Sequence, residues 1–330
     1  MTRRWNWDFD DHKRTEKPSS SRPSSSPLPN HRTHPRQVHI RRRRGAAVLA
    51  LIVAVAVAVG LLAGSHHDGA ASGAGMQGST HTTLKRTRGA SADRGQRPSD
   101  REDDQNAAVS AVLAYTPFVK EGGDRGREIA LTFDDGPGPY TPAVLSVLER
   151  FHVHATFFEI GEMLRYFSAS TVRALQDGDV IGDHTETHPF MATLSAHQQH
   201  EELFEQIARI ELAGGPRPVL FRPPYGSYDA TTMRELRKLH LLMVLWSDDT
   251  GDYLQPGVSV IVERALAGAH PGAIILMHDA GGTRTQTIEA LPSIIRGLRN
   301  RGYRLVTVPQ LLKDDPPPPG QTLPSSLSGD

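Results

Sequence analysis

Two patterns of hydrophobic and polar positions divide the chain. The first is an unbroken apolar run over Gly45–Gly64, which contains no charged or polar side chain. The second begins at Arg127, where short apolar runs of strand length alternate with amphipathic segments of helix length. Alternating strands and helices form a parallel sheet with helices packed outside it, so the second pattern predicts an α/β domain.

The strands and helices of this domain can be placed from the sequence. The candidate strands are Glu128–Phe133, Ala155–Ile160, Val180–Asp183, Val219–Arg222, Leu242–Ser247, Ala273–His278 and Tyr303–Val308. The helix boundaries are an N-cap and proline at Thr141-Pro142, a capping box at Ser195–Gln198, an N-cap at Asp229, and a helix end at Asn300 and Gly302. Seven strands fit an irregular (β/α) barrel of the TIM kind, and a doubly wound open sheet is the alternative.

The apolar run has the length of a membrane span. About twenty helical residues cover the ~30 Å hydrocarbon core of a bilayer. The basic run Arg41–Arg44 lies directly before it, which places the N-terminus in the cytoplasm and the domain outside. Gly45–Gly64 is therefore predicted to be a single transmembrane signal-anchor. A cleaved signal peptide, which would make the domain a secreted protein, is the alternative, although the polar lead-in is long for one.

Composition separates the remaining segments. Met1–Arg44 is rich in Ser, Pro and Arg and holds twelve basic against four acidic residues, although the whole chain is balanced at 37 of each. Because this basic tail leads into an apolar run, we expect it to face a membrane surface, and we expect no nucleic-acid partner. The predicted segments are a disordered tail over 1–44, the span over 45–64, a flexible linker over 65–126, the folded domain over 127–312 and a disordered tail over 313–330.

Two adjacent carboxylates end the first strand of the domain. Asp134 and Asp135 follow the apolar run Ile129–Phe133 and precede a Gly-Pro break. Adjacent side chains in a strand point to opposite faces, but a turn at the strand end can direct both into one pocket. Two such anions need a cation between them, either a metal ion or an arginine. An Asp-Asp-Gly turn that only closes the strand is the alternative.

A pair of histidines follows the third candidate strand. His184 and His188 are four residues apart, which on a helix places both rings on one face, and Pro189 favours a tight turn that also brings them together. With Asp135 they form a set of two imidazoles and one carboxylate that leaves positions open for water and substrate. The chain contains no cysteine, so any metal must be held by His and carboxylate ligands.

Three further strand ends carry polar side chains. Arg222 ends its strand beside two prolines and is placed to hold a carboxylate. Asp249 and Asp252 follow the next strand, and His278 ends the apolar run Ala273–Met277. A carboxylate beside His278 would raise its pKa and keep it protonated for acid catalysis. Because chemistry in a βα barrel lies at the carboxyl ends of the strands, five such clusters together favour one catalytic site.

These clusters, in this order, resemble the polysaccharide deacetylase family, the carbohydrate esterases that share the NodB-homology domain. The resemblance runs from about Arg127 to Val308. It rests on five motifs, which are TFDDGP at Thr132–Pro137, HTETH at His184–His188, RPPYG at Arg222–Gly226, DTGD at Asp249–Asp252 and LMH at Leu276–His278. The resemblance implies an irregular (β/α) barrel and the metal-dependent removal of N- or O-acetyl groups from sugars.

The resemblance also implies roles for the residues that match its motifs. Asp135, His184 and His188 would bind a divalent metal, usually zinc, with cobalt or another divalent ion as the alternative. Asp134 would be the general base that takes a proton from metal-bound water. His278 would be the general acid that protonates the leaving amine.

Five more residues have implied supporting roles. Arg222 would hold the general base, and Asp252 would orient the general acid. The backbone N–H of Tyr225 would stabilise the oxyanion, and Leu276 would line the pocket for the acetyl methyl group. Tyr253 would line the substrate groove at a position where the family usually has Trp, which leaves the shape of the groove there open.

The predicted protein is a membrane-anchored, extracytoplasmic hydrolase of an N-acetylated polysaccharide. Peptidoglycan is the expected substrate, because a tether outside a membrane places the domain in the cell wall. Chitin oligomers and O-acetylated xylan are alternatives, as is, in a different class, a wall-glycan-binding module without turnover. Asp183, which the family often replaces with Asn, is expected to have little effect on the chemistry.

Overall fold

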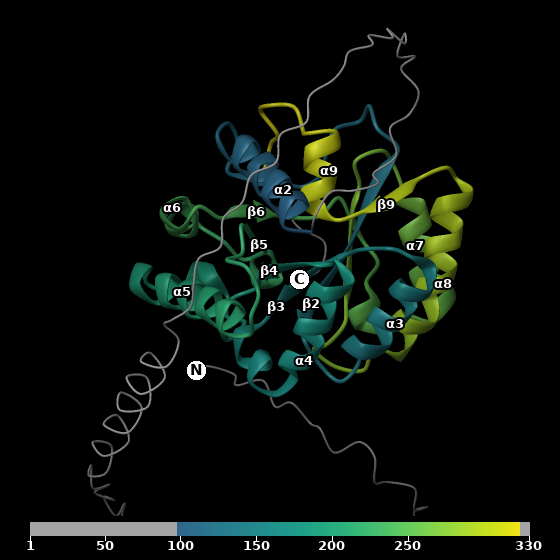
Figure 1. The fold of residues 1–330 in the computed structure, drawn as a ribbon, viewed down its shortest axis with the longest axis horizontal. Coiled ribbons are helices and arrows are strands. Elements are labelled where there is room, and N and C mark those ends of the chain that lie inside the picture. The colour runs from purple at the N-terminus through teal and green to yellow at the C-terminus, as the bar shows by residue number, and fades with distance from the viewer. Residues whose placement is uncertain (1–97, 324–330) are drawn as a thin grey trace, which may run out of the picture. The chain divides into compact units, whose positions relative to one another are not determined.

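The strands of residues 98–323, which the computed structural model describes, join in one parallel sheet (Figure 1). The strands are β1 (Phe118–Val119), β2 (Glu128–Gly136), β3 (Thr156–Glu159), β4 (Val180–Asp183), β5 (Leu220–Phe221), β6 (Leu242–Val244), β7 (Asp248–Asp249), β8 (Ile274–His278) and β9 (Arg304–Val306). Their order is β1-β6-β5-β4-β3-β2-β8-β7, and β9 pairs with the first residues of β2. All seven predicted strands are present, and β1 and β7 were missed because two residues show no periodicity.

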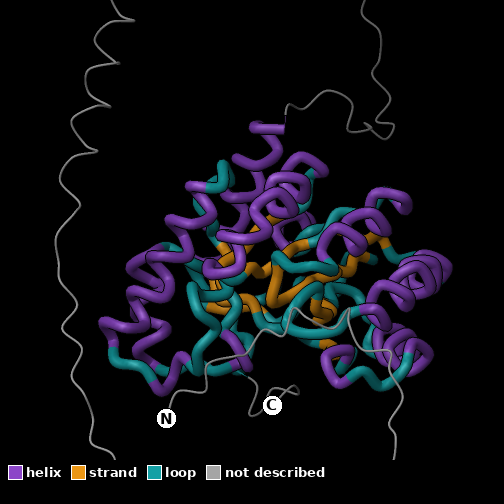
Figure 2. Tube along the Cα trace, turned by 90° about the horizontal axis from the view of Figure 1, so that it is seen from below, coloured by secondary structure: helices purple, strands orange, loops and turns teal. Residues whose placement is uncertain are grey.

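The sheet curls into an open half-barrel and does not close. β1 pairs only with β6 and β7 only with β8, so these two strands are the edges of the described sheet. Each edge strand is two residues long and offers few backbone groups for a closing pair. The expected α/β architecture with outer helices is correct, whereas the closed ring of a TIM barrel is not formed. Figure 2 shows the strands enclosed by helices.

The alternation of side chains along β2 creates two hydrophobic cores. Ile129, Leu131 and Phe133 point outward and pack with residues of the outer helices. Ala130 points inward and joins an inner core on the concave side of the sheet. The same alternation places Thr132 and then Asp134 on the inner side, at the carboxyl end of the strand. The strand pattern thus directs polar side chains into the mouth of the half-barrel.

The helices begin where the sequence places most of their caps. They are α2 (Pro98–Leu113), α3 (Thr141–Phe151), α4 (Gly161–Asp177), α5 (Ala196–Leu212), α6 (Ala230–Leu239), α7 (Val258–Ala267), α8 (Thr285–Asn300) and α9 (Val308–Asp314), with 3-10 turns η1 (Met191–Thr193), η2 (Pro224–Gly226) and η3 (Asp252–Leu254). Ser195 and Asp229 cap α5 and α6 with complete capping boxes. Thr141 is the first helical residue and not the predicted N-cap, because its Oγ1 instead accepts the Gly138 N–H at 2.7 Å.

The segment predicted to be a flexible linker is ordered where the structure describes it. Residues 98–126 form α2, β1 and the approach to β2. Helix α2 packs beside α9 (Figure 1), and its Val109 and Val112 enter the inner core at the amino end of the sheet. The linker expected over 65–126 therefore does not extend over 98–126. The helix α2 is difficult to predict from the sequence, because it is polar over most of its length and its apolar residues lie near its end.

The segment predicted to be a disordered tail is also ordered in part. Helix α9 continues to Asp314, and the next residue, Asp315, is buried. The Asp315 carboxylate accepts N–H bonds from Arg125 and Gly126 at 2.7 Å each, which fastens the C-terminal segment to the start of the domain. The tail expected over 313–330 therefore does not include its first described residues. Polar contacts to backbone N–H groups leave no hydrophobic pattern, so they cannot be predicted from the sequence.

The predicted membrane span lies outside the described residues. Over 98–323, each helix is too short or too polar to cross a bilayer. The assignment of Gly45–Gly64 as a signal-anchor stays a prediction from the sequence.

Candidate active site

The two aspartates at the end of β2 reach the same pocket because the strand is irregular there. The pairing of β2 with β3 shifts register between Asp134 and Gly136, and Asp135 has a φ of 73°. In a regular strand Asp135 would point to the outer core, but this bulge turns its carboxylate inward. His184 Nε2 lies 3.8 Å from Asp134 Oδ2 and 3.6 Å from Asp135 Oδ1. Two adjacent carboxylates therefore face one imidazole.

A fully buried arginine holds the first of these carboxylates. Arg222 Nη1 donates to Asp134 Oδ1 and to Thr132 Oγ1, both at 2.8 Å. Its Nε and Nη2 atoms each donate to one backbone carbonyl at the end of β6, those of Val244 and Leu245. The guanidinium lies 4.2 Å from the centre of the Phe158 ring and 5.7 Å from that of Trp246. Arg222 is thus held by several contacts and offers Asp134 a charge-assisted hydrogen bond.

The second carboxylate forms a possible metal site with the two histidines. One ligand atom each from Asp135, His184 and His188 lie within 4.8 Å of one another. His188 Nε2 is 3.1 Å from Asp135 Oδ1. The Nδ1 atoms point away, that of His184 to the Arg222 carbonyl at 2.7 Å and that of His188 to the Tyr225 hydroxyl at 3.1 Å. Partners on Nδ1 orient both rings so that Nε2 is presented to the pocket, as in histidine sites that bind metals.

The electrostatics of this triad suit a cation. Burial by itself raises the pKa of Asp135, but His188 and His184 outweigh it and hold that pKa well below its ordinary value. Burial lowers the pKa of His188, which favours the neutral ring that binds a metal. An ionised carboxylate and a neutral imidazole are the protonation states of metal ligands, so the three residues fit a divalent ion such as zinc.

A tight turn, and not a helix, brings the two histidines together. Thr185 and His188 have φ values of 71° and 60°, and the Thr185 Oγ1 accepts the His188 N–H at 2.9 Å. The buried Asp183 accepts the Thr185 N–H at 2.8 Å. Burial raises the pKa of Asp183 well above its ordinary value, which favours the neutral form of this side chain. In that form Asp183 would resemble the Asn that the family often has and would support the turn without adding charge.

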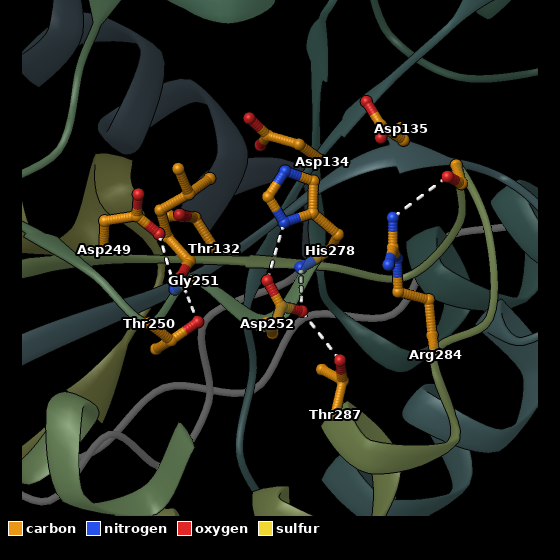
Figure 3. Close-up of polar contacts among 12 residues, drawn as sticks. Thr132, Asp134, Asp135, Asp249, Thr250, Gly251, Asp252, His278, Arg284 and Thr287 are labelled. Atoms are coloured by element: carbon orange, nitrogen blue, oxygen red, sulfur yellow. Dashed lines mark hydrogen bonds and ion pairs between the residues drawn. The ribbon is translucent and has the colours of Figure 1, made fainter. Parts of the chain in front are cut away.

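The other side of the pocket is formed by a histidine and its aspartate. His278 Nδ1 lies 2.8 Å from Asp252 Oδ1, and Asp252 Oδ2 accepts the His278 N–H at 2.9 Å and the Thr287 hydroxyl at 2.7 Å (Figure 3). Burial disfavours the charged ring, but the Asp252 carboxylate outweighs it and raises the pKa of His278 to about 9. Tyr253 covers this ring edge-on, with the ring centres 5.3 Å apart. His278 is therefore protonated at neutral pH.

The remaining predicted residues lie at the same end of the sheet. Asp134 and His278 are directly opposite each other in the β2–β8 pair, so the residues predicted to be the base and the acid are neighbours across two strands. Leu276 lies two residues before His278 on the same side of β8 and is buried in the inner core. Tyr225 lies in η2 with a φ of 56°, and its ring contacts His188. The structure thus places all ten predicted site residues at the carboxyl end of the sheet, on or directly after its strands.

Some residues of the site were not predicted from the sequence. Thr132 could have been found, because it lies two positions before Asp134 and so on the same face of the strand. Thr287 could not, because it comes from α8 and no motif marks it. Two buried acids, Glu159 and Asp279, were also not predicted. Burial raises the pKa of Glu159 to about 8 and that of Asp279 to about 7. Their proton uptake limits the negative charge beneath the pocket.

Comparison with known proteins identifies the class to which this fold and site belong. The family model described as polysaccharide deacetylase matches residues 121–244. The chain is 37% identical over 188 residues to a peptidoglycan-N-acetylglucosamine deacetylase of Bacillus cereus, which covers 56% of this chain and 88% of the relative. It is 35% identical over 212 residues to a chitooligosaccharide deacetylase of Rhizobium leguminosarum bv. trifolii, which covers 61% of this chain and 98% of the relative.

A solved structure agrees with these sequence relatives. The Bc1960 peptidoglycan N-acetylglucosamine deacetylase is 32% identical and superposes with a TM-score of 0.58, over 61% of this chain and 95% of that one. The chain belongs to the polysaccharide deacetylase family. It is an enzyme of that family, a hydrolase that acts on linear amides in N-acetylated polysaccharides.

Proposed function

We propose that this enzyme removes N-acetyl groups from peptidoglycan. The observation that carries the proposal is the placement of Asp134 and His278 on neighbouring strands, with the possible metal site of Asp135, His184 and His188 beside them. Amide hydrolysis needs one group that takes a proton from water and another that gives a proton to the departing amine. The pocket contains one candidate for each task on either side of the position for an acetamide.

A divalent metal, when bound by the triad, would polarise the acetyl carbonyl and make water acidic enough to lose a proton near neutral pH. Asp134 would accept the proton of the attacking water at its carboxylate. Arg222 holds this carboxylate through the 2.8 Å bond to Oδ1, which leaves Oδ2 directed toward His184 and the metal position. This arrangement supports Asp134 as base and Asp135 as ligand, although the two are adjacent.

His278 would give its proton from Nε2 to the nitrogen of the leaving amine, because its Nδ1 is bound to Asp252. Its raised pKa means that the proton is present at neutral pH. The Tyr225 N–H is the candidate donor to the oxyanion, since the loop that carries it is bound to the metal ligand His188. Leu276 and Tyr253 would line the acetyl pocket and groove.

Two considerations support peptidoglycan over other acetylated glycans. A relative at 37% identity is named for peptidoglycan N-acetylglucosamine. The sequence before residue 98 also predicts a membrane anchor with the domain outside, which would place the enzyme in the cell wall. Chitin oligomers are the second candidate, because a chitooligosaccharide deacetylase is matched over nearly its whole length. O-acetylated xylan is a third, and a wall-binding module without turnover is the alternative of another class.

Acetate release from a panel of glycans tests the proposal. Peptidoglycan, chitotetraose and acetylated xylan are incubated with the full-length protein, with its zinc content measured in parallel. We expect release from peptidoglycan that stops after chelation and returns with zinc. Faster release from chitotetraose or xylan would reassign the substrate. Binding to peptidoglycan with no acetate release from any substrate would favour the wall-binding module.

The location of the enzyme has a separate test. Membranes prepared from cells that produce the full-length protein should retain it, and protease added to intact cells stripped of their wall should digest the domain. Protein recovered only from the medium would instead show that the N-terminal segment is cleaved. Resistance of the domain to the protease, in cells that lack the wall but have an intact membrane, would contradict an extracytoplasmic domain.

A further inference from the structure

A phenylalanine lies at the surface beside the metal site. Phe190 follows His188 by two positions, and 51% of its surface is exposed. The next residue, Met191, is fully buried in the inner core, so the backbone direction turns the Phe190 side chain outward. Burying a phenylalanine is favourable, and a ring left half in water contributes little to the core. Its position therefore calls for an explanation other than packing of the domain.

The exposed ring is part of a series that leads to a metal ligand. Phe190 stacks on Tyr225 with ring centres 4.0 Å apart and planes 13° from parallel. The Tyr225 ring meets His188 edge-on at 4.6 Å, and the Tyr225 hydroxyl bonds His188 Nδ1. One face of Phe190 is thus used for the stack. Because the Tyr225 ring contacts both Phe190 and His188, Phe190 lies beside the predicted metal ligand and not among the ligands themselves.

Backbone contacts hold the stack in place. The Ser227 hydroxyl, two residues after Tyr225, accepts the Ala192 N–H at 3.2 Å. The Phe190 carbonyl accepts the Thr193 N–H at 3.0 Å and the Thr193 hydroxyl at 2.7 Å. The first bond ties the loop after the histidine pair to the loop of η2, and the other two fix the turn that follows Phe190. A ring fixed in this way loses little conformational freedom when something binds to it.

We propose that Phe190 and Tyr225 form a stacking platform for the sugar next to the one that loses its acetyl group. The inference rests on the proposed function, in which the substrate is a polymer that extends out of the pocket on both sides. A hexose with equatorial substituents presents a flat face of C–H groups, which packs on an aromatic ring as other apolar groups do. On the far side of the pocket, Tyr253 and the exposed Leu254 are available for the opposite direction of the chain.

The platform predicts that the enzyme distinguishes a glycan chain from a small acetyl compound through Phe190. The variants are Phe190→Ala, which removes the ring, and Phe190→Trp, which restores an aromatic face. Phe204→Ala is the matched control, because Phe204 is 53% exposed and stacks on His200, but lies on α5 and outside the pocket. Each full-length, zinc-loaded protein is assayed on chitotetraose and on 4-nitrophenyl acetate, which has no neighbouring sugar.

We expect Phe190→Ala to raise KM for chitotetraose about tenfold, equivalent to about 1.4 kcal/mol of binding, with kcat changed less than about twofold. Hydrolysis of 4-nitrophenyl acetate should stay unchanged, as should both reactions in Phe204→Ala. Phe190→Trp should restore KM. Equal losses on both substrates would show that Phe190 only holds Tyr225 in position, and unchanged KM would show no sugar contact. Either result overturns the platform.

A binding measurement keeps this test separate from that of the proposed function. If the unaltered protein releases no acetate, the proposed turnover fails, but chitotetraose can still be titrated into it by calorimetry. The platform then predicts binding that Phe190→Ala weakens about tenfold and Phe204→Ala leaves unchanged. Absence of binding, or equal binding by the Phe190→Ala variant, would refute the platform.

Discussion

Replacing Asp252 with asparagine removes one charge and almost no volume from the site. The Asp252 carboxylate contacts His278 twice, through Nδ1 at 2.8 Å and the backbone N–H at 2.9 Å, and accepts the Thr287 hydroxyl at 2.7 Å. An asparagine oxygen can still accept one of these bonds. The substitution therefore tests the charge of Asp252 more than the shape of the pocket.

The size of the effect follows from the pKa of His278. Burial alone would lower that pKa below 6.5, and Asp252 is the largest of the contributions that raise it to about 9. This difference corresponds to about 3 kcal/mol of preference for the protonated ring. Without the charge, the pKa should fall to its ordinary value or lower. A general acid must be protonated to act, so the alkaline limit of activity should move down by about 2.5 pH units or more.

The assay is the pH dependence of kcat/KM for acetate release from the substrate that the panel selects, at constant zinc. The unaltered enzyme should lose activity as the pH rises through about 9, and Asp252→Asn through about 6.5 or below. Thr287→Val is the control, because it removes one bond to Asp252 but keeps the charge, and should shift the limit only slightly. An alkaline limit that is identical in Asp252→Asn and the unaltered enzyme would refute His278 as the acid supported by Asp252.

The same pair makes stability depend on pH. The pKa of His278 is raised on folding, from 6.5 to about 9, so its stabilising contribution is complete below pH 6.5 and is lost as the pH rises through 9. The unaltered protein should exceed Asp252→Asn in unfolding free energy by about 3 kcal/mol near pH 6, with the difference shrinking near pH 10. A difference that grows with pH would contradict the assignment.

Three further variants test the other parts of the structure. Asp134→Asn should keep its zinc and lose about 10²- to 10⁴-fold in kcat, whereas His184→Ala should lose both the zinc and the activity. Loss of zinc from Asp134→Asn would reverse the roles assigned to the two aspartates. Arg222→Lys should lower the unfolding free energy in urea by about 2–4 kcal/mol and reduce acetate release, because a lysine cannot satisfy two buried carbonyls and Asp134 together. Asp315→Ala should cost about 2–3 kcal/mol in the same measurement with acetate release unchanged; an unaffected unfolding midpoint would mean that the C-terminal contact adds no stability.

The elements of the fold could be predicted where periodicity is strong. The β2 sequence alternates between two cores along its length, and Ser195 and Asp229 mark helix starts that depend only on local hydrogen bonds. The order of the strands and the failure of the sheet to close depend on contacts between distant segments, which no local pattern encodes. For the same reason the sequence predicts a linker where the polar helix α2 forms, although the few apolar residues of this helix complete the inner core.

The site residues could be predicted from the contrast between apolar strands and the polar residues that end them. The chemistry-bearing residues are polar side chains at the ends of apolar strands, and this contrast is visible in the sequence at Asp134, Arg222 and His278. Their supporting contacts were less visible. Thr287 reaches Asp252 from a helix 35 residues away, and the Phe158 ring that packs on Arg222 reads as an ordinary core residue. Sequence thus identifies the charged groups at the strand ends, including Arg222 and Asp252, but not the neutral side chains that support them from other elements.

Backbone conformation explains why the geometry of the site could not be predicted from the sequence. Seven non-glycine residues of the described chain have positive φ, and four of them are at the site: Asp135, Thr185, His188 and Tyr225. The other three follow helical segments, where this conformation is a common way to end a helix. At the site it costs about 1–3 kcal/mol for each residue and has no such local reason. It turns Asp135 inward, folds the histidine pair onto one point and directs Tyr225 toward His188, so the surrounding core must hold in place a geometry that these residues would not adopt alone.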